Sequence, residues 1–298
     1  MKIRFDKFSV GCIITIVVAL LVSGVADAKR KKNRHKKLSL TEHVVTPFFK
    51  AGDPGRGSAK GQQQLNAVNS ALTDVRINSR YRNTTKRYAA MTVNFNPACR
   101  VPNCVSYILT ADMVAVTNGP GAEHRRNYKF YADPSVSGCP DWFEYRGSGY
   151  DRGHMAPAND MRWSRQSMSD CFLMTNICPQ DHDLNGGSWN KLELKVHDWA
   201  MSHGKIVVAT GPVLNGASRR IGKNNDIVVP AGFFKVVLDP SRNSAIGFLY
   251  DNREGGGGVQ RHACSVDEVE RVTGHDFFSS LPDNVERQVE ANFNYNQW

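Results

Sequence analysis

Short runs of β-forming residues that alternate with turns limit the possible folds of this chain more than any other feature. These runs cover residues 87–94, 106–117, 205–210, 226–229, 233–238 and 245–250. Runs of this length, rich in Val, Ile, Phe and Tyr and separated by turn residues, are typical of β-strands. The pattern predicts an α+β fold with a mostly antiparallel central sheet.

Two segments have helical features instead, and we expect them to flank the sheet. Residues 188–201 carry apolar side chains at helical intervals, namely Trp189, Leu192, Val196 and Trp199. A second helix is expected to start after Ser265, because Ser265 and Glu268 have the spacing of a capping box.

Most of the positive charge of the chain lies in one short segment. The formal net charge is +10, of which residues 1–28 carry +1 and the run 29–37 carries +7, leaving +2 for residues 38–298. The high pI therefore gives little support for nucleic-acid binding by the folded body. With 41% apolar residues, the chain can still form a sizeable core.

The first 28 residues have the composition of a secretory signal peptide. Three basic residues precede an apolar stretch at 10–25, and Ala26-Asp27-Ala28 offers a cleavage site. We expect cleavage after Ala28 and a secreted or periplasmic protein without stable membrane association. An uncleaved anchor is the alternative, but the apolar stretch is short for the roughly 20 residues of a membrane span. A transit peptide is disfavoured because the segment is uniformly apolar.

The rest of the chain divides into a tail and a main domain. Residues 29–75 are basic at first and then rich in Gly and polar residues, so we expect a largely disordered tail or linker. The main domain is expected to cover residues 76–298.

Cleavage would remove Cys12 and leave an even number of cysteines, which favours disulfide bonds in an exported protein. The six are Cys99, Cys104, Cys139, Cys171, Cys178 and Cys264. The sequence does not determine their pairing. A zinc–thiolate site is disfavoured because the chain has no CxxC pair.

The segment Gly149–Pro157 places an acid, a guanidinium and an imidazole within four residues, as Asp151-Arg152-Gly153-His154. A positioned imidazole can activate water as a general base, and an arginine can stabilise negative charge on a phosphate. The run therefore suits phosphodiester hydrolysis. We expect Asp151 to be structural rather than catalytic.

A second cluster follows downstream, where Asn185 and Glu193 are eight residues apart around Trp189. On a helix, positions eight apart diverge by only about 80°, so both oxygens can face the same ion. Carboxamide and carboxylate oxygens suit Mg²⁺ or Mn²⁺ better than Zn²⁺. Trp189 itself is expected in the core, because it belongs to the apolar face of its helix.

Together, these motifs resemble the DNA/RNA non-specific endonuclease family, the group of Serratia-type and mitochondrial endonuclease G-like nucleases. The likeness rests on the DRGH run, the N-x-x-P-Q element at 176–180 and the Asn185/Glu193 pair, and it extends over about residues 85–290. The resemblance implies a ββα-metal architecture for the nuclease domain, in which two strands and a helix hold one hydrated Mg²⁺, with Mn²⁺ as a substitute.

The resemblance also implies residue roles. His154 corresponds to the general base, Asn185 to the direct metal ligand, and Glu193 to a catalytic residue that holds the metal through water. Arg152 corresponds to a phosphate clamp. A second arginine near the scissile phosphate corresponds to Arg126, although Arg125 could take that role instead.

Substrate contacts are implied for Asn176 and Gln180, in addition to Arg126 and Arg152. The expected activity is sequence-independent cleavage of DNA and RNA to 5′-phosphate products, since binding would depend on phosphate contacts. The alternatives are an inactive nucleic-acid-binding protein and a phosphodiesterase for small nucleotides. The sequence leaves the oligomeric state open, a homodimer included.

Overall fold

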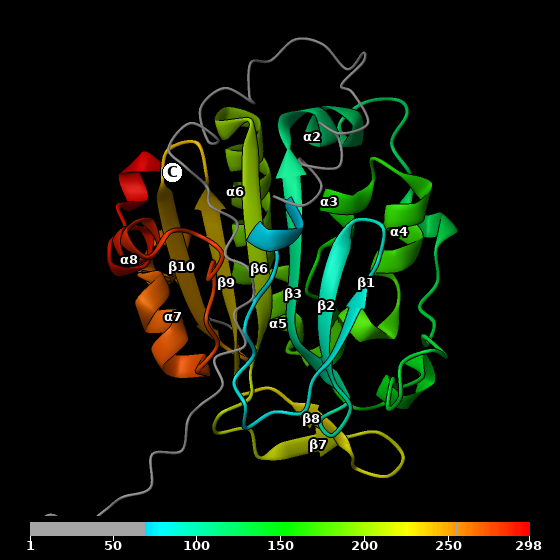
Figure 1. Ribbon diagram of the computed structural model, residues 1–298. Coiled ribbons are helices and arrows are strands. Elements are labelled where there is room, and N and C mark those ends of the chain that lie inside the picture. Colours follow the sequence, from blue (N-terminus) through cyan, green and yellow to red (C-terminus); the bar gives the residue numbers. More distant parts are fainter. Residues whose placement is uncertain (1–68, 254–255) are drawn as a thin grey trace, which may run out of the picture. The chain divides into compact units, whose positions relative to one another are not determined.

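A computed structural model describes residues 69–253 and 256–298 of the chain. A seven-stranded sheet has the order β1-β2-β3-β6-β9-β10-β11, and every neighbouring pair in it is antiparallel (Figure 1). Its strands are β1 (Thr84–Arg87), β2 (Met91–Asn96), β3 (Val101–Thr110), β6 (Lys205–Val213), β9 (Gly232–Asp239), β10 (Ser244–Asp251) and β11 (Ala263–Cys264). The predicted α+β class with a mostly antiparallel sheet is confirmed.

Two smaller sheets accompany the large one. One pairs β4 (Asp151–His154) with β5 (Ile177–Gln180), and the other pairs β7 (Arg219–Ile221) with β8 (Ile227–Val229). The β4–β5 pair carries the DRGH run.

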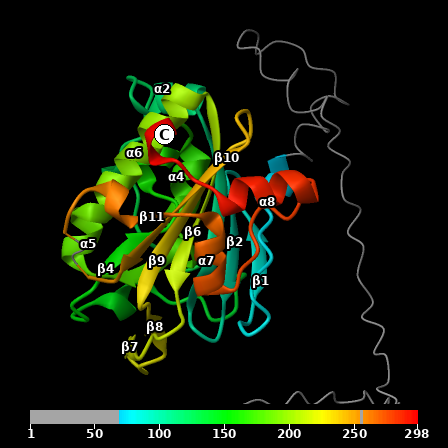
Figure 2. The same cartoon turned by 90° about the vertical axis from the view of Figure 1, so that its left-hand side faces the viewer.

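Helices cover both faces of the large sheet, so the packed part of the chain has three layers (Figure 2). The helices are α2 (Ala111–Thr117), α3 (Ala158–Met161), α4 (Arg165–Cys171), α5 (His182–Gly186), α6 (Ser188–His203), α7 (Val266–Thr273) and α8 (Asp283–Ala291). Helices α2 to α6 lie on one face, and α7 and α8 lie on the other (Figure 2). Among the described residues, no helix is both long and apolar enough to span a membrane.

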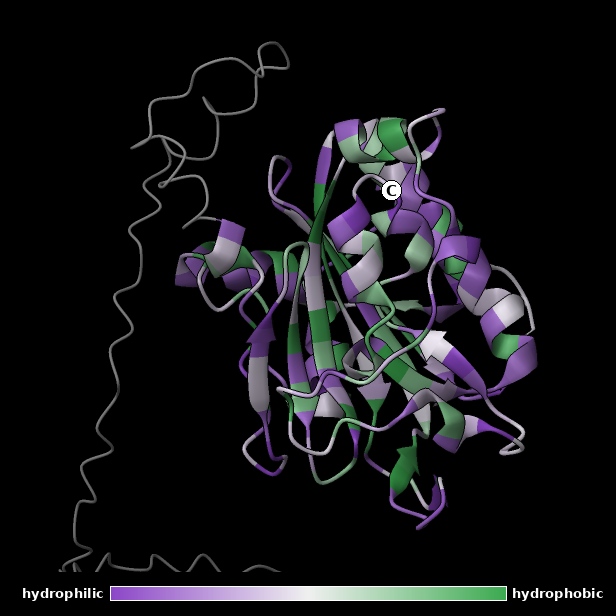
Figure 3. Ribbon diagram, turned by 90° about the vertical axis from the view of Figure 1, so that its right-hand side faces the viewer, coloured by the Kyte–Doolittle hydropathy of each residue, from purple (hydrophilic) through white to green (hydrophobic). Residues whose placement is uncertain are grey.

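Each face of the sheet has its own hydrophobic core, and the residues of the central strands serve both cores (Figure 3). On β9, Phe233 and Val237 point into the core beneath α6, while Phe234 and Val236 point into the core beneath α7. This alternation follows from the two-residue period of a strand. Leu72 is buried in the second core, so packing starts ahead of the expected domain boundary at residue 76.

The predicted helices are present, and one predicted strand is partly wrong. Helix α6 begins at Ser188, and Ser265 caps α7 by accepting a hydrogen bond from the backbone N–H of Glu268. In the run 106–117, however, the strand ends at Thr110 and a helix follows. The Thr110 side chain accepts the backbone N–H of Met113 and caps that helix, which hydrophobic composition alone does not reveal.

The expected disulfides are not present, because all six cysteines from Cys99 to Cys264 are free thiols. Cys171 and Cys178 are buried in the core beneath α6, whereas Cys104 is buried in the core on the opposite face. They fill space as small apolar side chains. Burial raises the pKa of the thiols of Cys104, Cys171 and Cys178, which keeps them protonated. Cys12, the signal segment and the basic run lie outside the described residues.

Candidate active site

The β4–β5 pair and the helices that follow it form a compact ββα unit, as the motif resemblance implied. Asp151 lies opposite Gln180 and His154 lies opposite Ile177 in the antiparallel register. The chain then enters α5, which carries Asn185, and α6, which carries Glu193. Motif residues that are far apart in the sequence are brought together in this way.

Gly153 is required in the DRGH run because Gln180 packs directly over it from the neighbouring strand. A Cβ atom at position 153 would lie 2.6 Å from the Cβ of Gln180. The Gln180 side chain is fully buried, and neither Nε2 nor Oε1 has a hydrogen-bond partner among the described residues. Such a buried amide is suited to bind water or a polar ligand.

His154 ends β4 inside an aromatic pocket. Its ring centre lies 5.2 Å from that of Phe130 and 5.0 Å from that of Phe172. Burial, with a smaller contribution from the positive charge of Arg125, lowers the pKa of His154 to about 3. The imidazole is therefore neutral at neutral pH, which is the state that a general base needs.

The two ring nitrogens of His154 differ in their access to solvent. Nε2 is buried without a hydrogen-bond partner among the described residues. Nδ1 is not among the buried atoms without a partner, and it makes no hydrogen bond to a described residue. Nδ1 is therefore the nitrogen that water can reach.

Arg152 extends from the same strand across two aromatic rings. Its Cζ lies 5.0 Å from the ring centre of Phe130 and 5.8 Å from that of Trp142. Because Phe130 also packs on His154, one ring holds both the guanidinium and the imidazole. Neither Phe130 nor Phe172 stands out in the sequence, since a single aromatic residue in a loop carries no periodic signal.

Asp151 orients the side chains around it. Its Oδ2 accepts a hydrogen bond of 2.8 Å from Nδ2 of Asn185 and lies 3.0 Å from Nδ1 of His182. Among the described residues, Asn185 and His182 are the side-chain partners of Asp151. Because Nδ2 of Asn185 is engaged, Oδ1 is the atom left to face a ligand.

Glu193 lies half-buried on α6, where the charges of the buried residues Lys235 and Asp160 act on it. Burial raises its pKa, and the neighbouring ammonium group of Lys235 opposes that rise. Lys235 is fully buried on β9, with Nζ 4.8 Å from the ring centre of Trp189. Sequence analysis did not single out Lys235, although a lone lysine in the apolar run 233–238 is a detectable signal. Trp189 is fully buried, as expected for a core residue.

The two candidate arginines differ in their surroundings. The Cζ of Arg125 lies 5.5 Å from the ring centre of Phe172, and its charge acts on both His154 and Glu193. Arg126 is exposed and makes no hydrogen bond or ion pair with a described residue. Arg125 is thus the arginine that the structure brings to His154.

Asn176 lies beneath the site rather than on its surface. Its Oδ1 accepts the backbone N–H of Ala156, and its Nδ2 donates to the carbonyls of Ala156 and Cys171. Both amide hydrogens are used, and the residue is fully buried. Asn176 therefore fixes the chain just after His154 and has no donor left for a substrate.

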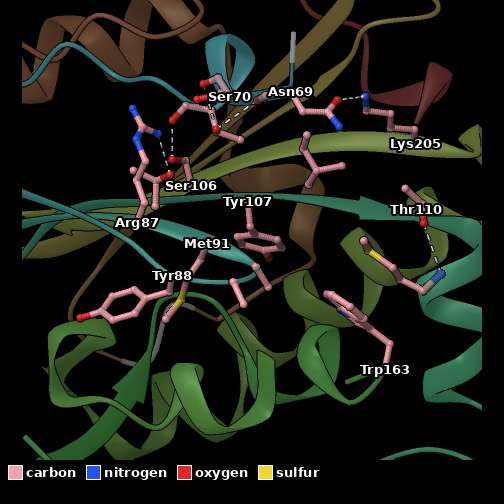
Figure 4. Close-up of a pocket in the computed structure, with 16 residues that line it drawn as sticks. Asn69, Ser70, Arg87, Tyr88, Met91, Ser106, Tyr107, Thr110, Trp163 and Lys205 are labelled. Carbon is pink, nitrogen blue, oxygen red and sulfur yellow. Dashed lines mark hydrogen bonds between the residues drawn. The ribbon is translucent and has the colours of Figure 1, made fainter. Parts of the chain in front are cut away.

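A separate cavity of about 410 Å³ lies away from these residues, next to β2 and β3 (Figure 4). Its walls include Tyr88, Met91, Tyr107 and Trp163, and Lys205 donates to Asn69 at one end of it. None of the motif residues lines it. It has no cluster of catalytic side chains that would suit hydrolysis.

Comparison with known proteins identifies the family of this chain. The sequence model of the family described as "DNA/RNA non-specific endonuclease" matches residues 69–284. The mitochondrial nuclease EXOG of Xenopus laevis is 30% identical over 217 residues, which cover 66% of this chain and 58% of that protein. Human mitochondrial endonuclease G is 38% identical over 129 residues, which cover 40% of this chain and 43% of that protein.

A solved structure has a similar fold. It is the crystal structure of the EndoG/EndoGI complex, a complex in which EndoG is inhibited. It matches with a TM-score of 0.61 and 27% identity, over 66% of this chain and 86% of that one. Since the chain spans only 58% of the Xenopus relative, likeness to whole proteins does not by itself establish its activity.

The expectation of a secreted or periplasmic protein is wrong. The EXOG and endonuclease G relatives are named as mitochondrial, as is a fission yeast relative that aligns with 84% of the chain. These names indicate mitochondria rather than secretion. The uniformly apolar stretch at 10–25 favoured a secretory signal over a transit peptide, and the names of these relatives overturn that expectation.

Proposed function

Because the chain belongs to the DNA/RNA non-specific endonuclease family, we propose that it is a metal-dependent endonuclease. It hydrolyses phosphodiester bonds of DNA and RNA with little sequence preference and leaves 5′ phosphates. The observation that carries the proposal is the neutral imidazole of His154, which ends β4 in the same ββα unit that carries Arg152 and Asn185. Mitochondria are its proposed location, by likeness to the named relatives.

The donor set fits a hard divalent ion, with Mg²⁺ preferred and Mn²⁺ as a substitute. Oδ1 of Asn185 is left for direct binding by the hydrogen bond from Nδ2 to Asp151. Glu193 and the unpartnered amide of Gln180 offer oxygens that can hold water molecules around the ion. When bound, the ion supplies stabilisation of the negative charge that develops on the phosphate.

The residues of this chain perform the remaining steps. Nδ1 of His154 takes a proton from the attacking water, and the rings of Phe130 and Phe172 keep the imidazole in position. Arg152 holds a phosphate oxygen. The charge of Arg125 reaches His154, which supports Arg125 in the role that the motif gives to Arg126.

Closed circular plasmid and single-stranded RNA are the substrates that test the proposal. The wild type should open the circle and degrade the RNA with Mg²⁺ or Mn²⁺, and EDTA should abolish both reactions. His154→Ala should slow cleavage by about 10²–10⁴-fold, and Asn185→Ala should remove the response to Mg²⁺. Products should be ligatable through their 5′ phosphates.

The two alternatives give different results in the same assay. An inactive binding protein would retard the plasmid in a gel without opening it. A phosphodiesterase for small nucleotides would cleave a dinucleotide and leave the circle closed. Either result would refute the endonuclease proposal.

A further inference from the structure

Three carboxylates meet between α7 and α8. Both helices lie on the face of the sheet opposite the candidate active site (Figure 2). Asp267 and Glu270 come from α7, and Glu290 comes from α8. One carboxylate oxygen from each lies within 4.8 Å of the other two. Asp267 and Glu270 are three residues apart and so share one face of their helix.

Exposure to solvent changes steadily across this acidic cluster of Asp267, Glu270 and Glu290. Glu290 is only 7% exposed, and its Oε1 is buried without a hydrogen-bond partner among the described residues. Glu270 is half-buried, and its Oε1 accepts the backbone N–H of Phe277 at 2.8 Å. Asp267 is exposed. The cluster therefore has a buried end, where an oxygen lacks a partner, and an end open to water.

Two arginines around the cluster pair with other acids. Arg271 forms an ion pair with Glu268, and Arg76 forms one with Asp276. No Lys or Arg of the described residues forms an ion pair with Glu270 or Glu290. Asp276 and Glu286 add further negative charge around them.

Burial and this negative charge raise the pKa values of Glu270 and Glu290. Burial first, and then the charge of Glu270, raises the pKa of Glu290 to about 9, and burial raises the pKa of Glu270 to about 7. A buried carboxylate without a partner is unstable in its charged form. The cluster needs either protons or a cation to neutralise it.

We propose that Asp267, Glu270 and Glu290 bind a hard divalent cation, best matched by Ca²⁺, that ties α7 to α8. Two oxygens at 2.3–2.6 Å from one Ca²⁺ ion are at most about 5 Å apart, which agrees with the spacing of the three carboxylates. Ca²⁺ accepts an irregular shell of six to eight oxygens, so water can complete it at the open Asp267 end. Protons neutralise Glu270 and Glu290 one at a time, whereas a cation binds oxygens from all three carboxylates at once, which matches their convergence on one point.

This site is independent of the proposed nuclease activity, and the test keeps the two separate. Thermal unfolding is measured on the full chain carrying Asn185→Ala, which removes the proposed active-site ligand, in EDTA and then with increasing Ca²⁺. At 100-fold above its Kd, Ca²⁺ should raise the Tm by about 5–10 °C. Calorimetric titration with Ca²⁺ should give one site per chain.

Three further substitutions test whether the Ca²⁺-dependent rise in Tm comes from the acidic cluster. Glu290→Gln and Asp267→Asn, each added to Asn185→Ala, should lose the rise in Tm. Glu268→Gln should keep it, because Glu268 lies on the same helix but pairs with Arg271 at the surface. In EDTA at pH 8, Glu290→Gln should unfold no earlier than its parent, since a pKa of about 9 leaves Glu290 mostly protonated and glutamine is a neutral side chain of the same shape. The absence of a Ca²⁺-dependent rise, or an equal rise in Glu290→Gln and Glu268→Gln, would refute the site and leave protonation as the means of neutralisation.

Discussion

The carboxylate of Asp151 accepts a hydrogen bond of 2.8 Å from Nδ2 of Asn185. A carboxylate can only accept hydrogen bonds, so this contact determines which end of the Asn185 carboxamide points away from Asp151. Oδ1 becomes the atom available to an ion. The first residue of the DRGH run therefore positions the side chain that we propose as the metal ligand, while Arg152 and His154 have the proposed roles toward the substrate.

Asp151→Asn should weaken the response to metal more than it lowers the maximal rate. An asparagine at position 151 can donate as well as accept, so it no longer holds Oδ1 of Asn185 outward. The Mg²⁺ concentration for half-maximal plasmid cleavage should rise by about 10–100-fold. Asp183→Asn is the matched control, because Asp183 is an exposed acid on the same short helix. Identical Mg²⁺ dependence in both variants would exclude this positioning role.

Gly153→Ala should destabilise the β4–β5 pair, because the new Cβ would lie 2.6 Å from that of Gln180. Overpacking of this kind costs about 1–3 kcal/mol in the free energy of unfolding. Adding Gln180→Gly removes the clashing atoms and should recover part of that loss, measured by denaturant unfolding. Gly186→Ala is the control, since a Cβ there meets nothing within 4 Å. If the double variant showed no recovery, the clash would not be the cause.

Acid should destabilise the protein partly through His154. The folded-state pKa is about 3 against 6.5 for a free imidazole, so the unfolded chain binds a proton at a higher pH than the folded one. This contribution to stability is therefore present above about pH 6.5 and is lost as the pH falls toward 3. In EDTA, the Tm of His154→Phe should fall less than that of the wild type between pH 7 and pH 4. Parallel Tm curves would show that His154 is not buried in its neutral form.

The fold was predictable where local sequence determines it. Runs of β-forming residues between turns indicated the strands, and the Asn185 to Glu193 segment indicated the helix start at Ser188. The helix at 111–117 was missed because its start depends on one side chain, that of Thr110, whereas composition alone resembles a strand. Disulfides were expected from an even number of cysteines, but the cysteines lie in two separate cores.

The site was predictable only where its residues are neighbours in the sequence. The motif residues lie on adjacent elements, so their order along the chain already indicated a common site. Phe130 joins them through long-range packing that no local pattern encodes, and the lone Lys235 in its apolar run does not reveal from the sequence which site it joins. The position of Lys235, for example, follows from the register of β6 and β9, in which Thr210 lies opposite Lys235.

Lys235→Met should move the acid limb of the activity profile to higher pH. The buried ammonium group opposes the rise in the pKa of Glu193, so its removal raises that pKa further and reduces the ionised fraction of Glu193 near neutral pH. An opposite charge at close range lowers a carboxyl pKa by about 1–3 units, and the shift of the limb should be of that order. Methionine keeps the volume against Trp189, so the protein should stay folded.

Lys191→Met provides the comparison, because Lys191 is exposed on the same helix as Glu193. It removes the same charge from the chain without altering the buried cluster, so its pH profile of kcat/KM should match that of the wild type. If Lys235→Met also matched the wild type across pH 5–9, Lys235 would only fill space beneath Trp189. A shift in the Lys235→Met profile alone would mean that its ammonium group keeps Glu193 ionised.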